Sequence, residues 1–191
     1  MAKVININID SITIECKLNS SNIPLQKITF KLEKKIFEPE IKDYIIVCNR
    51  DSKPPNNYVT TVFKSGKMII SNIRDFNDIE ATKKKVLLRM SQMGCDYNII
   101  STRVRESVVK YELENPVEDE SKISDSFGIC NYNKKMDVTI CSLLKGGPKN
   151  SYCIIKKNKK DIIMMGLESQ RQIEEVKDII ERNIAVQDNE F

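Results

Sequence analysis

The chain has 191 residues, of which 31 are Lys or Arg and 27 are Asp or Glu, and it contains no His and no Trp. The lack of His excludes serine triads, His-ligated zinc sites and a His general base. With 40% apolar and 30% charged residues, the composition is that of a globular protein with one large domain or two small ones. The net charge of +4 permits nucleic-acid binding but does not require it.

The cysteines and the apolar segments indicate in which cellular compartment the protein is expected. The six cysteines include no Cys-x-x-Cys pair, and no apolar run reaches the roughly 18–20 residues that a membrane span needs. The first ten residues, MAKVININID, alternate polar and apolar side chains and lack the apolar core of a signal peptide. We therefore expect reduced thiols in an intracellular protein that does not associate with a membrane.

A strand and a helix are predicted within the first 40 residues. From residue 5 to residue 9, isoleucine alternates with polar residues in the pattern of a half-buried strand. From residue 12 onward the apolar residues stand at even positions, and a bulge near 10–11 accounts for this change of phase. A helix is then predicted, with an N-cap at 20–22 and apolar residues at helical spacing at Leu25, Ile28, Leu32 and Ile36.

Three strands and a second helix complete the first half. The strands are predicted at 44–48, 58–63 and 68–72, and the last two are joined by a hairpin in which Gly66 supplies a positive φ. Asp75 or Asn77 can cap the helix that follows, and this helix ends at Gly94.

The second half repeats this order in part, because the ending of strand, turn, strand and helix occurs again. Strands are predicted at 99–113, 138–144, 151–155 and 162–165, with a lysine-rich turn at 156–161 and a final helix at 168–184. Ile69 and Ile163 occupy matching places, 94 residues apart. We therefore predict an internal duplication, with a first repeat at 1–95 and a second repeat at 96–191.

This order predicts an α+β fold in which each repeat is a curved antiparallel sheet with helices on one face. In the strand at 68–72, Met68 and Ile70 alternate with Ile69 and Ser71, so both faces of the strand carry apolar side chains. Because helices cover only one face, we expect the second face to meet a partner. Burial of that face against another domain is the alternative.

Charge is unevenly distributed in the second half. Six acidic residues and one Lys occupy 112–125, whereas six Lys and no acidic residue occupy 145–160. A basic segment beside an acidic one is compatible with nucleic-acid binding, and solvated surface is the simplest interpretation of either segment.

The segment 63–94 contains the stretches FKSGKMII and KKKVLLRMSQMG. They are similar to the aromatic-x-Ser-Gly-Lys hairpin and the long basic helix of the TATA-box-binding protein family, which this segment therefore resembles. Weaker similarities extend over most of both repeats, at Cys16-Lys17-Leu18, Phe37-Glu38-Pro39-Glu40, Val108-Val109-Lys110-Tyr111 and Met165-Gly166. The resemblance implies a TBP-like saddle of two pseudo-symmetric repeats with helices on the convex face.

In that family the concave sheet covers the minor groove, which is read mainly as A·T against G·C. Pairs of Phe insert between base steps and kink the duplex by about 80°, while Lys and Arg at the rim neutralise phosphates. By the resemblance, Phe63 is an intercalating residue and Thr61, Ile69 and Ser71 belong to the groove floor. Lys67 and Arg50 are rim cations by the same comparison. Asn8 corresponds to the floor Asn of the first strand, with Asn6 as the alternative.

The remaining positions depart from the family pattern. The second aromatic wedge of the first repeat is Tyr44, or lies at Ile41 or Lys42 if there is no insertion. In the second repeat the wedge positions correspond to Met136 and to a residue near Ile155 or Lys156, and the floor Asn to Thr102. The other groove residues that we expect in the second repeat are Val104, Ile163 and Met165.

The resemblance implies a general transcription initiation factor, not an enzyme and without a cofactor or metal, that binds A·T-rich double-stranded promoter DNA. Its expected partners are factor IIB-like and factor IIA-like proteins and the RNA polymerase machinery, with Lys83-Lys84-Lys85 and the acidic segment as docking surfaces. We expect a nuclear location, or a cytoplasmic viral replication site if the Asn-, Ile- and Lys-rich composition reflects a large DNA virus.

Two other classes remain open at this point. One is a saddle-shaped protein-interaction module that has lost stable TATA binding. The other is an enzyme or ligand carrier in which Glu38, Glu40 and Asp43 bind Mg²⁺, although no phosphate-cradling loop accompanies them.

Overall fold

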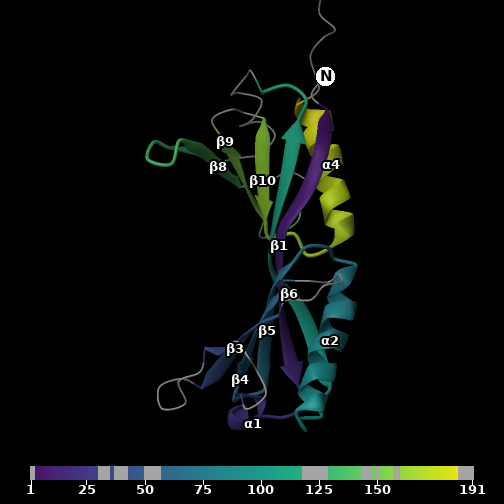
Figure 1. Cartoon of the computed structure of the whole chain (residues 1–191). Helices are drawn as coiled ribbons and strands as arrows, with labels where there is room; N and C mark the ends of the chain where they lie inside the picture. Colours follow the sequence, from purple (N-terminus) through teal and green to yellow (C-terminus); the bar gives the residue numbers. More distant parts are fainter. Residues whose placement is uncertain are drawn as a thin grey trace, which may run out of the picture. The chain divides into compact units, whose positions relative to one another are not determined.

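A computed structural model describes residues 3–29, 35–36, 43–49, 57–117, 129–142, 148, 151–156 and 160–184. These residues form ten strands and three helices (Figure 1). Seven elements belong to the first half of the chain: β1 (Val4–Leu18), α1 (Leu25–Thr29), β2 (Lys35–Ile36), β3 (Tyr44–Cys48), β4 (Val59–Phe63), β5 (Lys67–Ile73) and α2 (Asp78–Gln92). Six belong to the second: β6 (Ile99–Leu113), β7 (Cys130–Asn133), β8 (Val138–Ser142), β9 (Tyr152–Lys156), β10 (Asp161–Met165) and α4 (Gln170–Ile184).

The strands form one sheet in the order β2-β3-β4-β5-β1-β6-β10-β9-β8-β7. The pairings within each hairpin, and those of β1 with β5 and of β10 with β6, are antiparallel. The α+β class and the antiparallel sheet predicted from the sequence are therefore confirmed.

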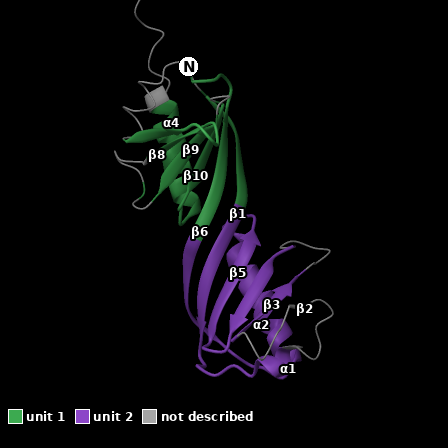
Figure 2. Cartoon of the chain, turned by 90° about the vertical axis from the view of Figure 1, so that its left-hand side faces the viewer, with its two compact units in different colours: residues 1–10, 106–191 green, residues 11–105 purple. Residues whose placement is uncertain are grey.

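The chain divides into two compact units (Figure 2). Unit 2 comprises residues 11–105, and unit 1 comprises residues 1–10 and 106–191. This division differs from the predicted repeat boundary at 95/96 because β1 and β6 each contribute residues to both units. The repeat boundary concerns the duplication of sequence, which the compact units do not test.

Most predicted elements coincide with the observed ones. The strands predicted at 44–48 and 99–113 are β3 and β6, and the ends of the other predicted strands and of the two long helices differ by one or two residues within the described ranges. The helix predicted to continue to Ile36 is wrong, because α1 covers only Leu25–Thr29 and Ile36 lies in β2, opposite Ile46 of β3. Strand pairing has overridden the helical spacing there.

The expected bulge in the first strand is also wrong. The buried side chains of β1 are Val4, Ile12, Ile14, Cys16 and Leu18, all at even positions. Ile5 is exposed and Ile7 and Ile9 are half-buried, so these isoleucines are not the core row. The irregularity lies in the partner strand, where Ile12 and Ile14 pair with Ile73 and Ile70 and Asn72 has a φ of 66°. The apparent change of phase falls where β1 passes from unit 1 to unit 2.

In unit 2, α2 covers one face of the sheet (Figure 1). Val86 and Met90 of α2 line a small cavity together with Val47, Thr60 and Val62 of β3 and β4. Met68 and Ile70 of β5 belong to the same core and are fully buried. Alternation along the strands therefore places the side chains between them on the face opposite α2.

A buried polar cluster links α2 to the sheet of unit 2. The Asn49 side-chain amide donates hydrogen bonds to the Thr60 hydroxyl and to the Val47 backbone carbonyl, both at 3.1 Å, and Arg89 of α2 donates one to the side-chain oxygen Oδ1 of Asn49. Because buried polar groups are costly when unpaired, these bonds hold α2 in one position on β3 and β4.

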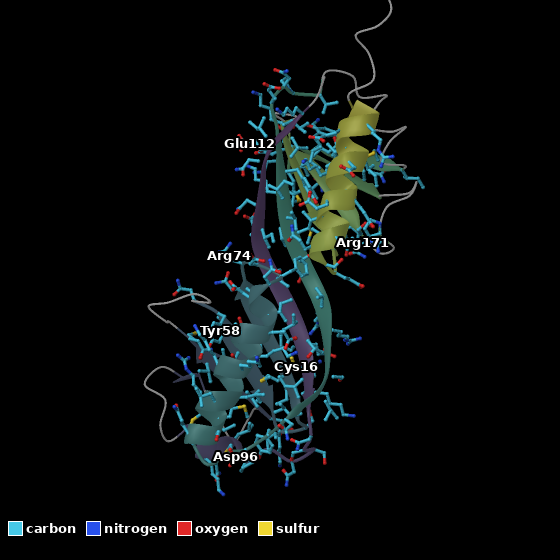
Figure 3. The ribbon with its side chains drawn as sticks, turned by 90° about the vertical axis from the view of Figure 1, so that its right-hand side faces the viewer. Cys16, Tyr58, Arg74, Asp96, Glu112 and Arg171 are labelled. Atoms are coloured by element: carbon cyan, nitrogen blue, oxygen red, sulfur yellow. A yellow bond between two sulfur atoms is a disulfide. The ribbon has the colours of Figure 1, made fainter. Side chains whose placement is uncertain are left out.

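In unit 1, α4 covers one face of the sheet in the same way (Figure 1). Its buried residues are Ile173, Val176, Ile179 and Ile180. The Tyr111 hydroxyl donates a hydrogen bond of 3.0 Å to the carbonyl of Ile173, and the Ser107 hydroxyl donates one of 2.6 Å to the carbonyl of Leu167. Cys16 and Glu112, labelled in Figure 3, mark the two long strands β1 and β6 that carry these cores.

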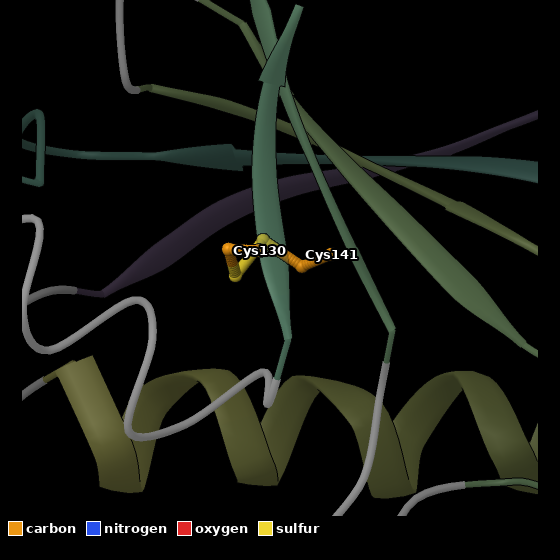
Figure 4. Close-up of a disulfide and its surroundings, with 2 residues drawn as sticks. All are labelled: Cys130 and Cys141. Carbon is orange, nitrogen blue, oxygen red and sulfur yellow. A yellow bond between two sulfur atoms is a disulfide. The ribbon is translucent and has the colours of Figure 1, made fainter.

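The expectation that all thiols are reduced is wrong for one pair. Cys130 and Cys141 lie directly opposite each other on β7 and β8 and form a disulfide (Figure 4). Cys153 lies opposite Cys141 on the next strand, and burial raises the pKa of its thiol to about 12. Burial and the raised pKa both disfavour the thiolate, which is the nucleophile in disulfide exchange. Cys16, Cys48 and Cys95 are free thiols as well.

Two further observations concern the described residues alone. None of their helices has the length and apolar character that crossing a membrane requires. None of their His, Cys, Asp and Glu side chains form a group of three or more that could hold a metal ion.

Candidate nucleic-acid interface

The face of the unit 2 sheet opposite α2, here called the outer face of unit 2, carries most of the predicted first-repeat residues. Thr61 of β4 lies in register between Ile46 of β3 and Ile69 of β5, and Ile69 lies opposite Glu15 of β1. These four side chains form a row across four strands. The outer face of unit 2 comprises Tyr44, Ile46, Val59, Thr61, Phe63, Lys67, Ile69, Ser71 and Glu15, all of them half-buried.

An aromatic pair stands at one end of this face. Tyr44 and Phe63 are opposite each other in register, with their ring centroids 5.5 Å apart and their planes tilted by 47°. The Lys67 ammonium lies 5.5 Å from the centroid of the Phe63 ring, within the range of a cation–π contact. The structure thus brings together two predicted wedge residues and one predicted rim cation.

The hairpin that carries Lys67 is held in place by the chain segment after β1. Gly66 has a φ of +83°, and a Cβ there would stand 1.7 Å from the Ser20 carbonyl oxygen, so only glycine fits. Leu18 donates a backbone hydrogen bond to the Gly66 carbonyl and Ile23 donates one to the Lys64 carbonyl, both at 2.8 Å. The position of Lys67 beside Phe63 is therefore set by backbone contacts.

A carboxylate lies among the cations of this face. Glu15 forms ion pairs with Lys67 at 3.1 Å and with Arg103 of β6 at 2.7 Å. Hydrogen bonds from Lys67 and then from Arg103 lower the pKa of Glu15, although burial opposes this shift. The three residues line a groove of about 510 Å³ whose other walls are Cys16, Lys17, Ser65, Ser101 and Thr102.

The outer face of unit 1, opposite α4, is built by two rows across the sheet. Ile163 of β10 lies in register between Ile154 of β9 and Lys110 of β6, and Ile154 lies opposite Ile140 of β8. In the second row, Met165 lies between Tyr152 and Val108. Tyr152 is 51% exposed and Ile140 is 37% exposed, so this face also presents apolar surface.

An acidic residue occupies the outer face of unit 1 as well. Asp161, at the start of β10, forms ion pairs with Lys110 at 2.9 Å and with Lys156 at 3.4 Å. The hydrogen bond from Lys110 to Asp161 raises the pKa of that lysine, with burial as the opposing effect.

Other predicted second-repeat residues are dispersed. Met136 lies in the turn between β7 and β8 and is 64% exposed. The alternative wedge Ile155 is wrong, because its side chain is 2% exposed and belongs to the core beneath α4. Lys156, the other alternative, is exposed and pairs with Asp161. Val104 is half-buried on β6 within unit 2.

The predicted polar floor residues lie on β1 and β6. Asn8 is exposed on β1, where its amide donates a hydrogen bond of 2.6 Å to Asp10, and the alternative Asn6 is exposed too. Thr102 is exposed on β6, and its hydroxyl lies 3.8 Å from the sulfur of Cys16, a residue of the core row. The predicted residues Arg50, Ile41, Lys42, Glu38 and Glu40 lie outside the described residues.

Glu15 and Asp161 are not among the site residues predicted from the sequence. The signal that could have found Glu15 is its odd position between the buried residues Ile14 and Cys16, which places it on the outer face. Asp161 could have been found as the residue that precedes the strand at 162–165, at the end of the lysine-rich turn.

On the helix side of unit 2 lie the lysines predicted as a docking surface, of which Lys83 has a defined acidic partner. Lys83 of α2 forms an ion pair of 2.6 Å with Glu80, one helical turn before it. Such a pair on a helix surface contributes only a few tenths of a kcal/mol to stability.

The antiparallel sheet, with a helix on one face of each unit and apolar side chains on the other, is an α+β architecture. No family model matches the chain, and no curated protein matches it. Among the solved structures, the chain is similar to the TBP of Methanococcus jannaschii, with a TM-score of 0.71. The similarity covers 94% of this chain and 98% of that chain, at 18% sequence identity. At this identity the comparison shows the fold.

Proposed function

We propose that this chain is a non-enzymatic transcription initiation factor that binds A·T-rich promoter DNA in the minor groove and bends it. The outer faces of the two units supply the contact surface. The observation that carries the proposal is the outer face of unit 2, where the aromatic pair, Lys67 and the row through Thr61 and Ile69 lie together in a TBP-like fold.

The chemistry of this face suits a minor groove. Phe63 and Tyr44 are apolar wedges that can enter a base step, and unstacking the bases bends the duplex. Ile69 and Thr61 are small enough to follow the groove floor, where A·T pairs present acceptors and no exocyclic amino group. Lys67 stands beside the wedge, where it can neutralise a phosphate.

The pseudo-repeat is part of the same proposal. In unit 2, four strands, β2 to β5, lead into α2, and in unit 1, four strands, β7 to β10, lead into α4. In both units the strand before the long helix contains four successive residues in which buried and half-buried side chains alternate, 68–71 in β5 and 162–165 in β10. This correspondence supports an internal duplication.

The partners and the location follow from this function. Factor IIB-like and factor IIA-like proteins and the RNA polymerase machinery are the proposed partners, with the helix side of each unit as the surface left for them. The proposed location is the nucleus, or a cytoplasmic viral replication site. The mechanism needs no cofactor and no metal, because binding and bending break no covalent bond.

A second candidate function is a protein-interaction module with a TBP-like fold. The ion pairs of Glu15 and Asp161 favour it, because each carboxylate neutralises cations on an outer face. A protein partner would then take the place of the duplex on these faces.

One titration separates the two candidates. Fluorescence anisotropy is measured for labelled A·T-rich and G·C-rich duplexes at about 50 mM and about 200 mM salt, a range over which phosphate contacts weaken strongly. Promoter binding predicts tighter binding of the A·T-rich duplex and a steep loss of affinity at the higher salt concentration. An interaction module predicts no measurable affinity for either duplex.

A further inference from the structure

Each unit holds two cations of its outer face on one carboxylate. In the Glu15 triad, one carboxylate oxygen faces Lys67 and the other faces Arg103, at 3.1 and 2.7 Å. In the Asp161 triad, one oxygen faces Lys110 and the other faces Lys156, at 2.9 and 3.4 Å. The two triads use different strands but have the same composition, one acid shared by two cations.

In each triad the acid is more buried than the two cations. The Glu15 and Asp161 side chains are 18% and 12% exposed, whereas their four cations range from 31% to 71%. The cations are therefore reachable from solvent, and each carboxylate lies beneath them. Glu112, in register opposite Asp161, adds a further acidic side chain beside the second triad.

The triads lie next to the apolar rows of the outer faces. Glu15 is in register with Ile69, and Lys110 is in register with Ile163. Hydrogen bonds to Lys67 and Arg103 lower the pKa of Glu15, so this carboxylate is ionised at neutral pH. A phosphate that approaches these cations therefore meets a negative charge already in place.

We propose that Glu15 and Asp161 compete with DNA phosphates for the cations of the triads. They weaken the contacts to the DNA backbone, and the choice between A·T-rich and G·C-rich duplexes is left to the residues at the groove floor. The inference rests on the proposed function. A cation that is already paired with a carboxylate gains less from a phosphate and releases fewer counterions. Because phosphate contacts carry no sequence information, weakening them lowers affinity for every duplex alike.

The test compares Glu15→Gln and Asp161→Asn with two matched variants on the helix side. Glu80→Gln removes the acid of the Lys83 pair on α2, and Glu175→Gln removes the acid of the Arg171 pair on α4. All four variants change the net charge by the same amount. Affinity is measured for A·T-rich and G·C-rich duplexes over a series of salt concentrations.

We expect Glu15→Gln and Asp161→Asn each to increase the affinity at low salt by about tenfold and to steepen the slope of log affinity against log salt by about 1–2. Both duplexes should gain by the same factor, so the ratio between them stays constant. Glu80→Gln and Glu175→Gln should give the affinity and slope of the unchanged protein, because they add the same charge away from the outer faces.

Two results would overturn the inference. If the unchanged protein binds the A·T-rich duplex but Glu15→Gln and Asp161→Asn bind no better than the helix-side variants, the triads only fasten strands and the proposed function survives. If neither the unchanged protein nor any variant binds a duplex, the inference and the proposed function fail together. Circular dichroism of each variant verifies that the fold is retained.

Discussion

The two units have equivalent cores but different outer faces. Under α2, β5 contributes Met68 and Ile70, and under α4, β10 contributes Ile162 and Met164, all fully buried. On the outer faces, unit 2 presents the pair of Tyr44 and Phe63, whereas unit 1 presents Tyr152 in register with Met165. The difference indicates that helix packing constrains one side of each strand, while the other side is free to diverge in chemistry.

The largest expected effect tests the equivalence of the cores. Ile70→Ala in unit 2 and Met164→Ala in unit 1 should each lower the free energy of unfolding by about 2–5 kcal/mol, because both leave a cavity in a packed core. Ile69→Ala and Ile163→Ala, on the outer faces, should cost about 1 kcal/mol or less. Urea denaturation measures all four. Equal losses for the inner and outer members of a pair would mean that the outer face is itself buried.

The disulfide is a feature of unit 1 that concerns stability. Cys130→Ser should lower the free energy of unfolding by about 2–3 kcal/mol, the loss expected for opening a loop of this length. The unchanged protein in a reducing buffer should unfold at the same urea concentration as this variant. Cys48→Ser, at an exposed free thiol of unit 2, is the control and should have little effect. A stability that does not respond to reduction would show that the disulfide contributes nothing.

Under the proposed function, we expect the aromatic pair of unit 2 to contribute more to kinking the duplex than any residue of unit 1. Phe63→Ala should weaken binding of an A·T-rich duplex by more than about 1 kcal/mol, or about fivefold, since the ring and its stacking are both lost. Phe63 is half-buried on the outer face, so the fold should be retained. Unchanged affinity in an anisotropy titration would remove Phe63 from the interface.

Smaller effects are expected at the weaker wedge positions. Tyr44→Ala should cost less affinity than Phe63→Ala, and Met136→Ala in unit 1 should cost less than either, because Met136 is a flexible side chain, 64% exposed, in the turn between β7 and β8. The same titration ranks the three variants. A larger loss for Tyr44→Ala than for Phe63→Ala would mean that the pairing of wedge residues is reversed.

Much of the fold was predictable because its signals are local. The strand at 99–113 and the hairpin around Gly66 follow from alternation and turn chemistry, and both are present in the structure. The core row of β1 was not predictable in the same way, because Ile5, Ile7 and Ile9 carry the stronger pattern but lie outside the core. Which row is buried depends on where the helices pack, a property of the tertiary structure.

The residues of the candidate site also fall into those that local sequence signals identify and those that depend on the tertiary structure. Phe63 and Lys67 could be located because the hairpin that joins them resembles the aromatic-x-Ser-Gly-Lys hairpin of the TATA-box-binding protein family. Glu15 and Asp161 could not be assigned a role, because their ion pairs join residues that are up to 88 positions apart in the sequence. Ile155 was misassigned because neighbouring strand residues face opposite sides, and a shift of one position exchanges the core for the outer face.

The most direct test of the account is the bending of DNA. An A·T-rich duplex labelled at both ends with a donor and an acceptor dye is titrated with the full chain, and energy transfer is recorded. We expect transfer to rise on binding, because a wedge such as Phe63 kinks the duplex and brings its ends together, and we expect Phe63→Ala to reduce the rise. Binding without a change in transfer, or no binding at all, would contradict it.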